Sequence, residues 1–165
     1  MKEIKLSNGR LVKVSDEDYD HLSQFKWHAR KAHDKTETLY AVRSIPHPLG
    51  LKYKNGKTKR KTIQMHRELM SFPENIDVDH IDGDGLNNTR ENLRLATKTQ
   101  NQRNRKLTKT NKYGYNGIRK IGNKYYARLR IDGKEKCFSG YDTLEQAIEA
   151  KKLLEKQYYG DFVRK

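Results

Sequence analysis

The clearest alternation of apolar and polar positions lies in the C-terminal third of the chain. Residues 125–131 alternate between two faces, one of them apolar through residues such as Leu129. The other face carries Tyr126, Arg128 and Arg130. This pattern predicts a half-buried strand that presents arginine and tyrosine to solvent or to a ligand.

A turn and a helix are expected to complete this C-terminal unit. The Asp-Gly pair at 132–133 predicts a tight turn into a second strand over 134–141. Thr143, with Gln146 three residues later, forms a capping-box pattern, and apolar residues then recur at helical spacing as far as Tyr158. We therefore expect a helix to cover one face of the sheet.

The N-terminal segment, residues 1–62, is predicted to be mostly strand. Asn-Gly pairs at 8–9 and 55–56 are tight-turn signals between β-rich runs, and Ser15 is a candidate N-cap of a short helix. Residues 51–62 carry six Lys or Arg and no acid. Two interpretations of this basic stretch stay open. It is either a solvated loop or a β-ribbon that contacts nucleic-acid phosphates through Lys57, Lys59 and Arg60.

The central segment, residues 63–106, predicts a strand, a long loop, a second strand and a helix. Residues 77–81 are strand-like, and residues 82–92 are rich in the Gly, Asp and Asn that favour turns. A short strand over 93–96 leads to Thr97, a candidate N-cap of a polar helix. The expected organisation is a basic β-rich segment, this central unit, a linker and a C-terminal unit, at residues 1–62, 63–106, 107–113 and 114–165.

Charge is distributed unevenly over the 165 residues, whose formal net charge is +15. Residues 1–62 carry a net +8, residues 63–107 carry none and residues 108–165 carry +7. Such an excess indicates a polyanionic partner, above all nucleic acid. No apolar run approaches the ~20 residues of a membrane helix, and the N-terminus lacks a signal-peptide core. The single cysteine, Cys137, cannot form an internal disulfide. We expect a soluble, cytoplasmic protein with no membrane partner.

The neutral central segment holds the candidate chemistry. Asp79 and His80 are adjacent at a predicted strand end, Asn92 follows the loop, and Asn101 and Asn104 share a face of the predicted helix. Carboxylate and amide oxygens suit a hard cation such as Mg²⁺, which needs only one or two protein ligands. A neutral imidazole nearby could take a proton from water. Because adjacent strand residues point to opposite faces, Asp79 and His80 would flank a phosphate from two sides unless the strand bends.

The run VDHIDGDGLNNTRENLRLATKTQNQRN, residues 78–104, resembles the ββα-metal motif of HNH endonucleases of the phage and homing type. The likeness spans about residues 63–104, including Met65-His66-Arg67, and the matching motif positions are Asp79, His80, Asp82, Gly83, Asn87, Asn88, Asn92, Leu93, Thr97 and Asn101. The last motif letter is Asn rather than His, which disfavours softer metals.

This resemblance implies roles for the matched residues. Asp79 and Asn101 would bind one Mg²⁺ or Mn²⁺, with Asn104 the less favoured alternative to Asn101. His80 would be the general base for the attacking water. Asn92 would brace the long loop, and Asn88 is likewise expected to be structural. For His66 two interpretations stay open, packing beneath the loop or positioning of phosphate, and packing is preferred.

The C-terminal unit resembles an AP2-type DNA-binding domain. The matching pieces are NGIRK at 116–120 and KYYARLRIDGKEKCFSGYDTLEQAIEAKKLLEKQYYGDF at 124–162. The resemblance implies a three-stranded sheet that enters the major groove with an exposed face formed by Arg119, Tyr126, Arg128, Arg130 and Lys136. Tyrosines stand at 125 and 126 where tryptophan is frequent in that family, so base preferences do not transfer.

The sequence therefore predicts an α+β protein that hydrolyses a DNA phosphodiester to a 5′-phosphate and a 3′-hydroxyl. One motif cuts one strand, so we expect a monomer or weak dimer acting on double-stranded DNA. The resemblance implies a homing or phage mobile-element role, in a bacterial cell or a phage-infected host. Two rivals remain: a non-catalytic DNA-binding regulator that uses the central unit only as a scaffold, and an RNA-binding protein.

Overall fold

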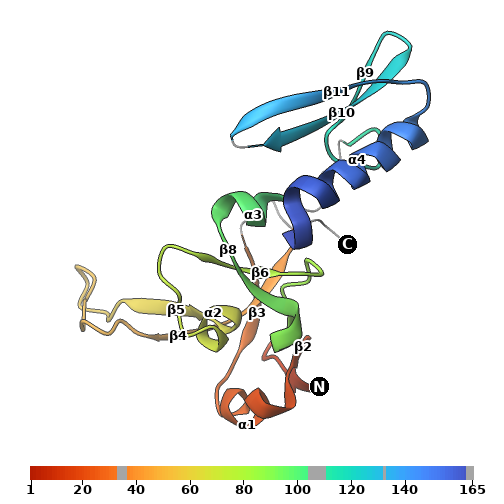
Figure 1. The fold of residues 1–165 in the computed structure, drawn as a ribbon. Helices are drawn as coiled ribbons and strands as arrows, with labels where there is room; N and C mark the ends of the chain where they lie inside the picture. The colour runs from red at the N-terminus through yellow and green to blue at the C-terminus, as the bar shows by residue number, and fades with distance from the viewer. Residues whose placement is uncertain (33–36, 104–110, 132, 163–165) are drawn as a thin grey trace. The chain divides into compact units, whose positions relative to one another are not determined.

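The computed structural model describes residues 1–32, 37–103, 111–131 and 133–162. These residues form several small sheets and four α-helices (Figure 1). The α+β class expected from the sequence is confirmed. The chain divides into two compact units, Met1–Asn101 and Gln102–Lys165, and each has its own apolar core. No helix in the described ranges is long and apolar enough to cross a membrane.

Two short strands and a helix begin the first unit. Strands β1 (Lys2–Lys5) and β2 (Leu11–Val14) form an antiparallel hairpin whose turn is closed by Gly9 at φ 82°. Helix α1 (Asp16–Ser23) follows at Ser15 as predicted. The Ser15 hydroxyl, however, does not cap α1. It accepts a hydrogen bond from the backbone N–H of Arg90 at 2.9 Å, because the loop before β8 packs against this corner.

Three further strands form the second sheet of this unit, in the order β3-β4-β5. They are β3 (His28–Lys31), β4 (Leu39–Pro46) and β5 (Arg60–Gln64), and helix α2 (Met65–Leu69) follows directly. The segment between β4 and β5 continues as a hairpin, with a Lys52–Thr58 bridge and a turn at Gly56, φ 78°. It projects from the rest of the unit in Figure 1. The basic stretch thus begins as an exposed hairpin and ends in β5, and its contact with nucleic-acid phosphates stays a prediction.

The core of the first unit lies between these sheets and α1. Trp27 is its largest fully buried side chain, and its indole N–H donates to the Leu22 carbonyl at 2.8 Å. Apolar side chains from β1, β2, α1, β4 and the β5–α2 junction surround it. This packing fixes β4 and α2, the two elements that will face the candidate site.

The central segment adopts the predicted order of elements. Strand β6 (Asp77–His80) pairs antiparallel with β8 (Leu93–Ala96), and helix α3 (Lys98–Arg103) follows. The loop between the strands contains β7 (Asn87–Asn88), which pairs with β2, and the 3-10 turn η1 (Arg90–Asn92). Thr97 and Gln100 exchange side-chain and backbone hydrogen bonds at the start of α3, as a capping box does.

The second unit contains a three-stranded antiparallel sheet in the order β11-β10-β9 and one long helix. The elements are β9 (Ile118–Ile121), β10 (Lys124–Ile131), β11 (Lys134–Tyr141), α4 (Leu144–Tyr159) and the 3-10 turn η2 (Gly160–Phe162). The predicted capping box at Thr143 and Gln146 is present, and α4 packs mainly on β10. Asp132 of the predicted turn and residues 107–110 of the predicted linker lie outside the described residues.

Candidate active site

Strand β6 carries the two residues at the centre of the predicted chemistry. Asp79 is 6% exposed and His80 is 5% exposed, so both side chains are buried at the end of the strand. Asp77 shares a face of β6 with Asp79, because residues two apart on a strand point the same way. After His80 the chain leaves the strand, and the Ile81 N–H donates to the Asn92 carbonyl at 2.9 Å.

Asp79 is paired with an arginine that sequence reasoning did not single out. Arg94 lies opposite Asp79 in the β6–β8 register, and its Nε and one terminal nitrogen donate to Asp79 Oδ2 at 2.9 and 2.8 Å. The Arg94 side chain is only 15% exposed, so this ion pair is largely buried. Removing one partner of a buried ion pair is strongly destabilising, because it leaves an uncompensated charge. The antiparallel register could have suggested the pair once both strands were predicted.

Asn101 reaches the same strand from the first turns of α3. Its side-chain N–H donates to Asp77 Oδ2 at 3.2 Å. The structure thus brings Asn101 to the face of β6 that also carries Asp79, which fits the pairing of these residues in the sequence motif. Asp77 itself was missed by sequence reasoning. The alternative residue, Asn104, lies outside the described part of the chain.

The His80 ring is held by an asparagine from the loop. Nε2 of His80 lies 3.2 Å from Oδ1 of the fully buried Asn88. The Nδ2 group of Asn88 donates to the Gly85 carbonyl at 3.4 Å, and this hydrogen bond orients the amide. Because Oδ1 can only accept, the His80 proton lies on Nε2 and the lone pair on Nδ1. Asn88 therefore selects the tautomer of His80 in addition to filling the loop.

Burial sets the protonation state of His80. Desolvation lowers the pKa of His80 below its usual value, against the raising effects of the Asn88 hydrogen bond and of Asp82, Asp79 and Asp84. The imidazole is therefore neutral near pH 7. A neutral imidazole with nearby carboxylates is suited to accept a proton, because those carboxylates stabilise the imidazolium that forms.

Two aromatic side chains from β4 and α2 contact His80. The His80 ring centroid lies 5.7 Å from that of Tyr40, nearly stacked, and 5.0 Å from that of His66, edge-on. The ring centroids of Tyr40 and His66 also lie 4.9 Å apart. His66 therefore packs in this three-ring cluster, the interpretation preferred from the sequence. Tyr40 had no sequence signal, because only the fold brings β4 next to the motif.

His66 is buried with one nitrogen unsatisfied. Its Nδ1 has no hydrogen-bond partner among the described residues. Burial, with smaller effects from His80 and Arg67, lowers the pKa of His66 to about 3. A buried polar atom without a partner costs about 1–3 kcal/mol. The folded state therefore keeps His66 uncharged at an energetic cost that an apolar ring would not have.

Substituting His66→Phe tests this electrostatic effect. The folded pKa of about 3 lies below the unfolded value near 6.5, so protonation of His66 has no effect on folding above pH 6.5 and destabilises the folded state increasingly as the pH falls towards 3. Each pH unit in that window costs about 1.4 kcal/mol. We expect the variant to lose stability less steeply between pH 6 and 4, and to be no less stable at pH 7.5. Urea unfolding followed by Trp27 fluorescence, the single Trp and a core residue of the first unit, measures both. An unchanged pH slope would contradict the assignment.

The loop between β6 and β8 is closed by a network centred on Asn92. Its amide donates to Asp82 Oδ1 at 3.0 Å and to the Asn87 carbonyl at 2.8 Å, and its Oδ1 accepts from the Asp82 N–H at 3.1 Å. Burial alone would raise the pKa of Asp82, but hydrogen bonds from Asn87, from the Asp84 backbone and from Asn92 lower it overall. An ionised Asp82 thus holds the loop that carries Asn88.

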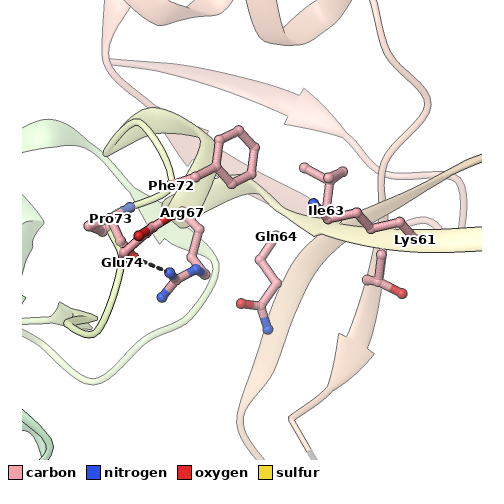
Figure 2. Close-up of a pocket in the computed structure, with 8 residues that line it drawn as sticks. Lys61, Ile63, Gln64, Arg67, Phe72, Pro73 and Glu74 are labelled. Carbon is pink, nitrogen blue, oxygen red and sulfur yellow. Dashed lines mark hydrogen bonds between the residues drawn. The ribbon is translucent and has the colours of Figure 1, made fainter. Parts of the chain in front are cut away.

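A pocket of about 330 Å³ lies beside the segment that leads into β6. Figure 2 shows Pro73 and Glu74 on one side of Arg67, Gln64 on the other and the Phe72 ring above it. Arg67 donates to the carbonyls of Pro73 and, at 3.3 Å, Ile76. It therefore anchors the chain that enters β6 at Asp77. The pocket lining contains none of the predicted catalytic or metal-binding residues.

The metal-binding expectation can be tested against the donor atoms present. Among the described residues no cluster of three or more His, Cys, Asp or Glu side chains forms a metal centre. The oxygen donors near one face of β6 are instead two carboxylates and one amide, from Asp77, Asp79 and Asn101. Such a set fits a hard cation that retains several waters, as Mg²⁺ does, and fits a thiophilic metal poorly.

The sheet of the second unit has a polar face and a helix-covered face. Arg119 pairs with Tyr126 across β9 and β10, and Arg128 and Arg130 follow on the same face. Lys136 was expected there as well, but the register places it opposite Leu129, whose side chain is buried on the helix side. Cross-strand partners share a face. Lys136 therefore leaves the sheet from the other side, which corrects the expectation.

The polar face also contains an acid. Glu135 lies opposite Arg130 and accepts a hydrogen bond from Arg128 at 3.0 Å. On the basic hairpin of the first unit, Lys57 and Arg60 are exposed, and Lys59 lies with its ammonium 5.6 Å from the Tyr53 ring centroid. The structure therefore leaves most of the predicted phosphate-binding side chains accessible.

Known proteins with similar sequences bear on the family of this chain. A family model described as HNH endonuclease matches residues 71–103. The chain is 33% identical over 161 residues to the "Uncharacterized HNH endonuclease L560" of Acanthamoeba polyphaga mimivirus, covering 93% of this chain and 73% of that protein. It is 34% identical over 92 residues to "Protein 3.8" of Escherichia phage T7, covering 54% of this chain and 76% of the phage protein. No solved structure matches.

These similarities establish the class of the protein. The chain belongs to the HNH endonuclease family, and the resemblance drawn from residues 78–104 is confirmed at that level. The relative from the mimivirus aligns along nearly the whole chain, so the kinship is not confined to the motif.

Proposed function

We propose that this chain is a metal-dependent DNA endonuclease that hydrolyses a phosphodiester to a 5′-phosphate and a 3′-hydroxyl. The observation that carries the proposal is the state of His80. It is buried and neutral, its tautomer is fixed by Asn88, and it adjoins the carboxylate of Asp79. A solvated surface histidine would show none of these features.

In this proposal His80 is the general base. Its Nδ1 takes a proton from the water that attacks phosphorus, while Nε2–H remains bonded to Asn88 Oδ1. The imidazolium then faces Asp79, Asp82 and Asp84, whose charges favour it. The hydrogen bond to Asn88 keeps the ring from rotating, so the basic nitrogen stays aimed at one point.

Asp79 and Asn101 are the residues proposed to hold one Mg²⁺ or Mn²⁺. When bound, such a cation would neutralise charge that develops on the phosphate and on the leaving oxygen. Arg94 holds one oxygen of Asp79 and so orients the carboxylate. A ligand oriented by a fixed partner loses less freedom when it binds a cation.

Duplex DNA would be held by the basic flanks of the chain. The hairpin bearing Lys57, Lys59 and Arg60 is proposed to contact phosphates. The second unit is proposed to act as an AP2-like module whose Arg119, Tyr126, Arg128 and Arg130 face reads a groove. A homing or phage-type role rests on the likeness of the motif, and the two named relatives belong to a virus and a phage.

The test is a nicking assay with the full chain, supercoiled plasmid and Mg²⁺ or Mn²⁺. We expect relaxed circles that a ligase can reseal, since a 5′-phosphate and a 3′-hydroxyl are ligase substrates. Plasmids carrying the natural locus of the gene should be included. Binding without nicking on every DNA would support the rival regulator. Tighter binding to duplex RNA than to duplex DNA would support the RNA-binding rival.

Glu135→Gln tests the DNA face of the second unit. The change removes the acid that holds Arg128, so we expect tighter DNA binding and a log–log salt slope steeper by about 1. Fluorescence anisotropy with labelled duplex at several salt concentrations measures both quantities. Glu149→Gln, the same charge change on α4, is the matched control. Equal effects of the two variants would show that total charge, not this face, governs binding.

A further inference from the structure

Asp77 is a carboxylate that the proposed chemistry does not use. It opens β6, is half-buried, and accepts the hydrogen bond from Asn101 Nδ2 at 3.2 Å. The Asn101 backbone is fixed as well, because its N–H donates to the Thr97 carbonyl at 2.9 Å in the first turn of α3. Main chain and side chain of Asn101 are therefore each held by one partner.

The hydrogen bond with Asp77 determines which end of the Asn101 amide faces Asp77 and which end faces away from it. A carboxylate only accepts hydrogen bonds, so the atom that meets Asp77 must be the N–H-bearing nitrogen. The amide oxygen is then at the opposite end of the group. An amide without such a partner could turn over and present its nitrogen, which is no ligand for a hard cation.

The negative charges of Asp77 and Asp79 both affect the hydroxyl of Tyr40. Burial raises the pKa of the Tyr40 hydroxyl, and the negative charges of Asp79 and Asp77 raise it further. Both carboxylates are therefore near enough to act on the Tyr40 hydroxyl, and the Tyr40 ring packs against His80. This agrees with their positions two residues apart on β6.

We propose that Asp77 is the positioning residue of the metal site: it holds Asn101 by its side-chain N–H so that the amide oxygen is presented to the cation. The inference rests on the proposed function, in which Asp79 and Asn101 are the ligands. In this role Asp77 would orient a metal ligand without contacting the ion itself, as carboxylates that hydrogen-bond to metal ligands commonly do.

Mn²⁺ binding in the absence of DNA tests the proposal, with free Mn²⁺ measured by electron paramagnetic resonance during titration. We expect Asp77→Ala to weaken Mn²⁺ binding by about 10–100-fold, the usual cost of losing such a partner. Asp77→Asn removes the charge but keeps an acceptor oxygen, so it should lose much less. Asp20→Ala, at an acid on α1 away from the site, is the matched control and should bind as wild type. Circular dichroism checks the fold, and Asp77→Val replaces an Ala variant that folds poorly, since Val suits a strand.

A double-mutant cycle with Asn101→Ala separates positioning from direct ligation. If Asp77 acts through Asn101, Asp77→Ala adds little, at most about twofold, once Asn101 is already Ala. Full additivity in the cycle would overturn the proposal, and so would wild-type binding by Asp77→Ala. Equal losses in Asp77→Ala and Asp77→Asn would also overturn it, because charge alone would then explain the effect. If Asp79→Ala and Asn101→Ala both bind Mn²⁺ as wild type, the proposed ligand pair fails instead.

Discussion

Replacing His80 with Ala is expected to lower the nicking rate by about 10²–10⁴-fold, the range that a positioned general base contributes. The neighbouring imidazole is a poor substitute for this proton transfer. His66, the adjacent imidazole, is held neutral by burial, and its pKa of about 3 makes it a poor base near pH 7. Initial rates on supercoiled plasmid, with protein in excess and saturating Mg²⁺, measure the change.

DNA affinity should be unaffected by this substitution. His80 is buried and lies apart in sequence from the basic hairpin and from the second unit, so anisotropy with labelled duplex should give the wild-type Kd. His21→Ala is the matched control, because His21 is an exposed histidine on α1 that pairs with Glu68 and takes no part in the site. Nicking by His80→Ala at the wild-type rate would remove His80 from the mechanism and leave contamination or another site as the source of activity.

Local sequence signals predicted the elements of this fold well. Asn-Gly and Gly-containing turns, the N-cap Thr97, the capping pair Thr143/Gln146 and the alternation in 125–131 each reflect interactions within a few residues. The residues that make such interactions are neighbours in the sequence, so a single sequence is enough to find them. The order of strand, loop, strand and helix in the central segment followed from the same signals.

The partners of the candidate site could not be predicted in the same way. Tyr40 lies on β4, and no periodic pattern links it to the motif, yet it stacks near His80. Ser15 is a second example. Its position before α1 suggests an N-cap, but its hydroxyl accepts a hydrogen bond from the Arg90 backbone N–H instead, because the fold brings Arg90 next to it. Lys136 was placed on the wrong face because it was assigned from the family resemblance and not from the register. The regular pairing of Ile131 with Lys134 places Lys136 opposite Leu129.

Gly85 lies in close contact with Leu39 and Tyr40 of β4. A Cβ at Gly85 would lie 2.5 Å from Cδ1 of Tyr40 and would overlap the Leu39 carbonyl oxygen. Its own carbonyl accepts the hydrogen bond that orients Asn88. Gly85 thus connects β4, Tyr40 and the residue that fixes the His80 tautomer, although it carries no side chain.

Gly85→Ala is therefore expected to lower both stability and activity. Overpacking of this kind costs about 1–3 kcal/mol of unfolding free energy. A displacement of about 1 Å at Asn88 or Tyr40 would misplace the His80 ring and reduce nicking by about 100-fold. Urea unfolding followed by Trp27 fluorescence measures the first effect, and plasmid nicking at low temperature, where the variant remains folded, measures the second.

Gly9→Ala provides the matched control for this prediction. Gly9 has a φ of 82°, and a methyl group added there would meet no atom within 4 Å, so the substitution strains the backbone without touching the site. It should destabilise the first unit by about 1 kcal/mol and leave the nicking rate of the folded protein unchanged. If Gly85→Ala behaves the same way, the contact with Tyr40 serves packing alone. If it reduces nicking far beyond its effect on folding, the support that β4 gives to His80 is part of the catalytic machinery.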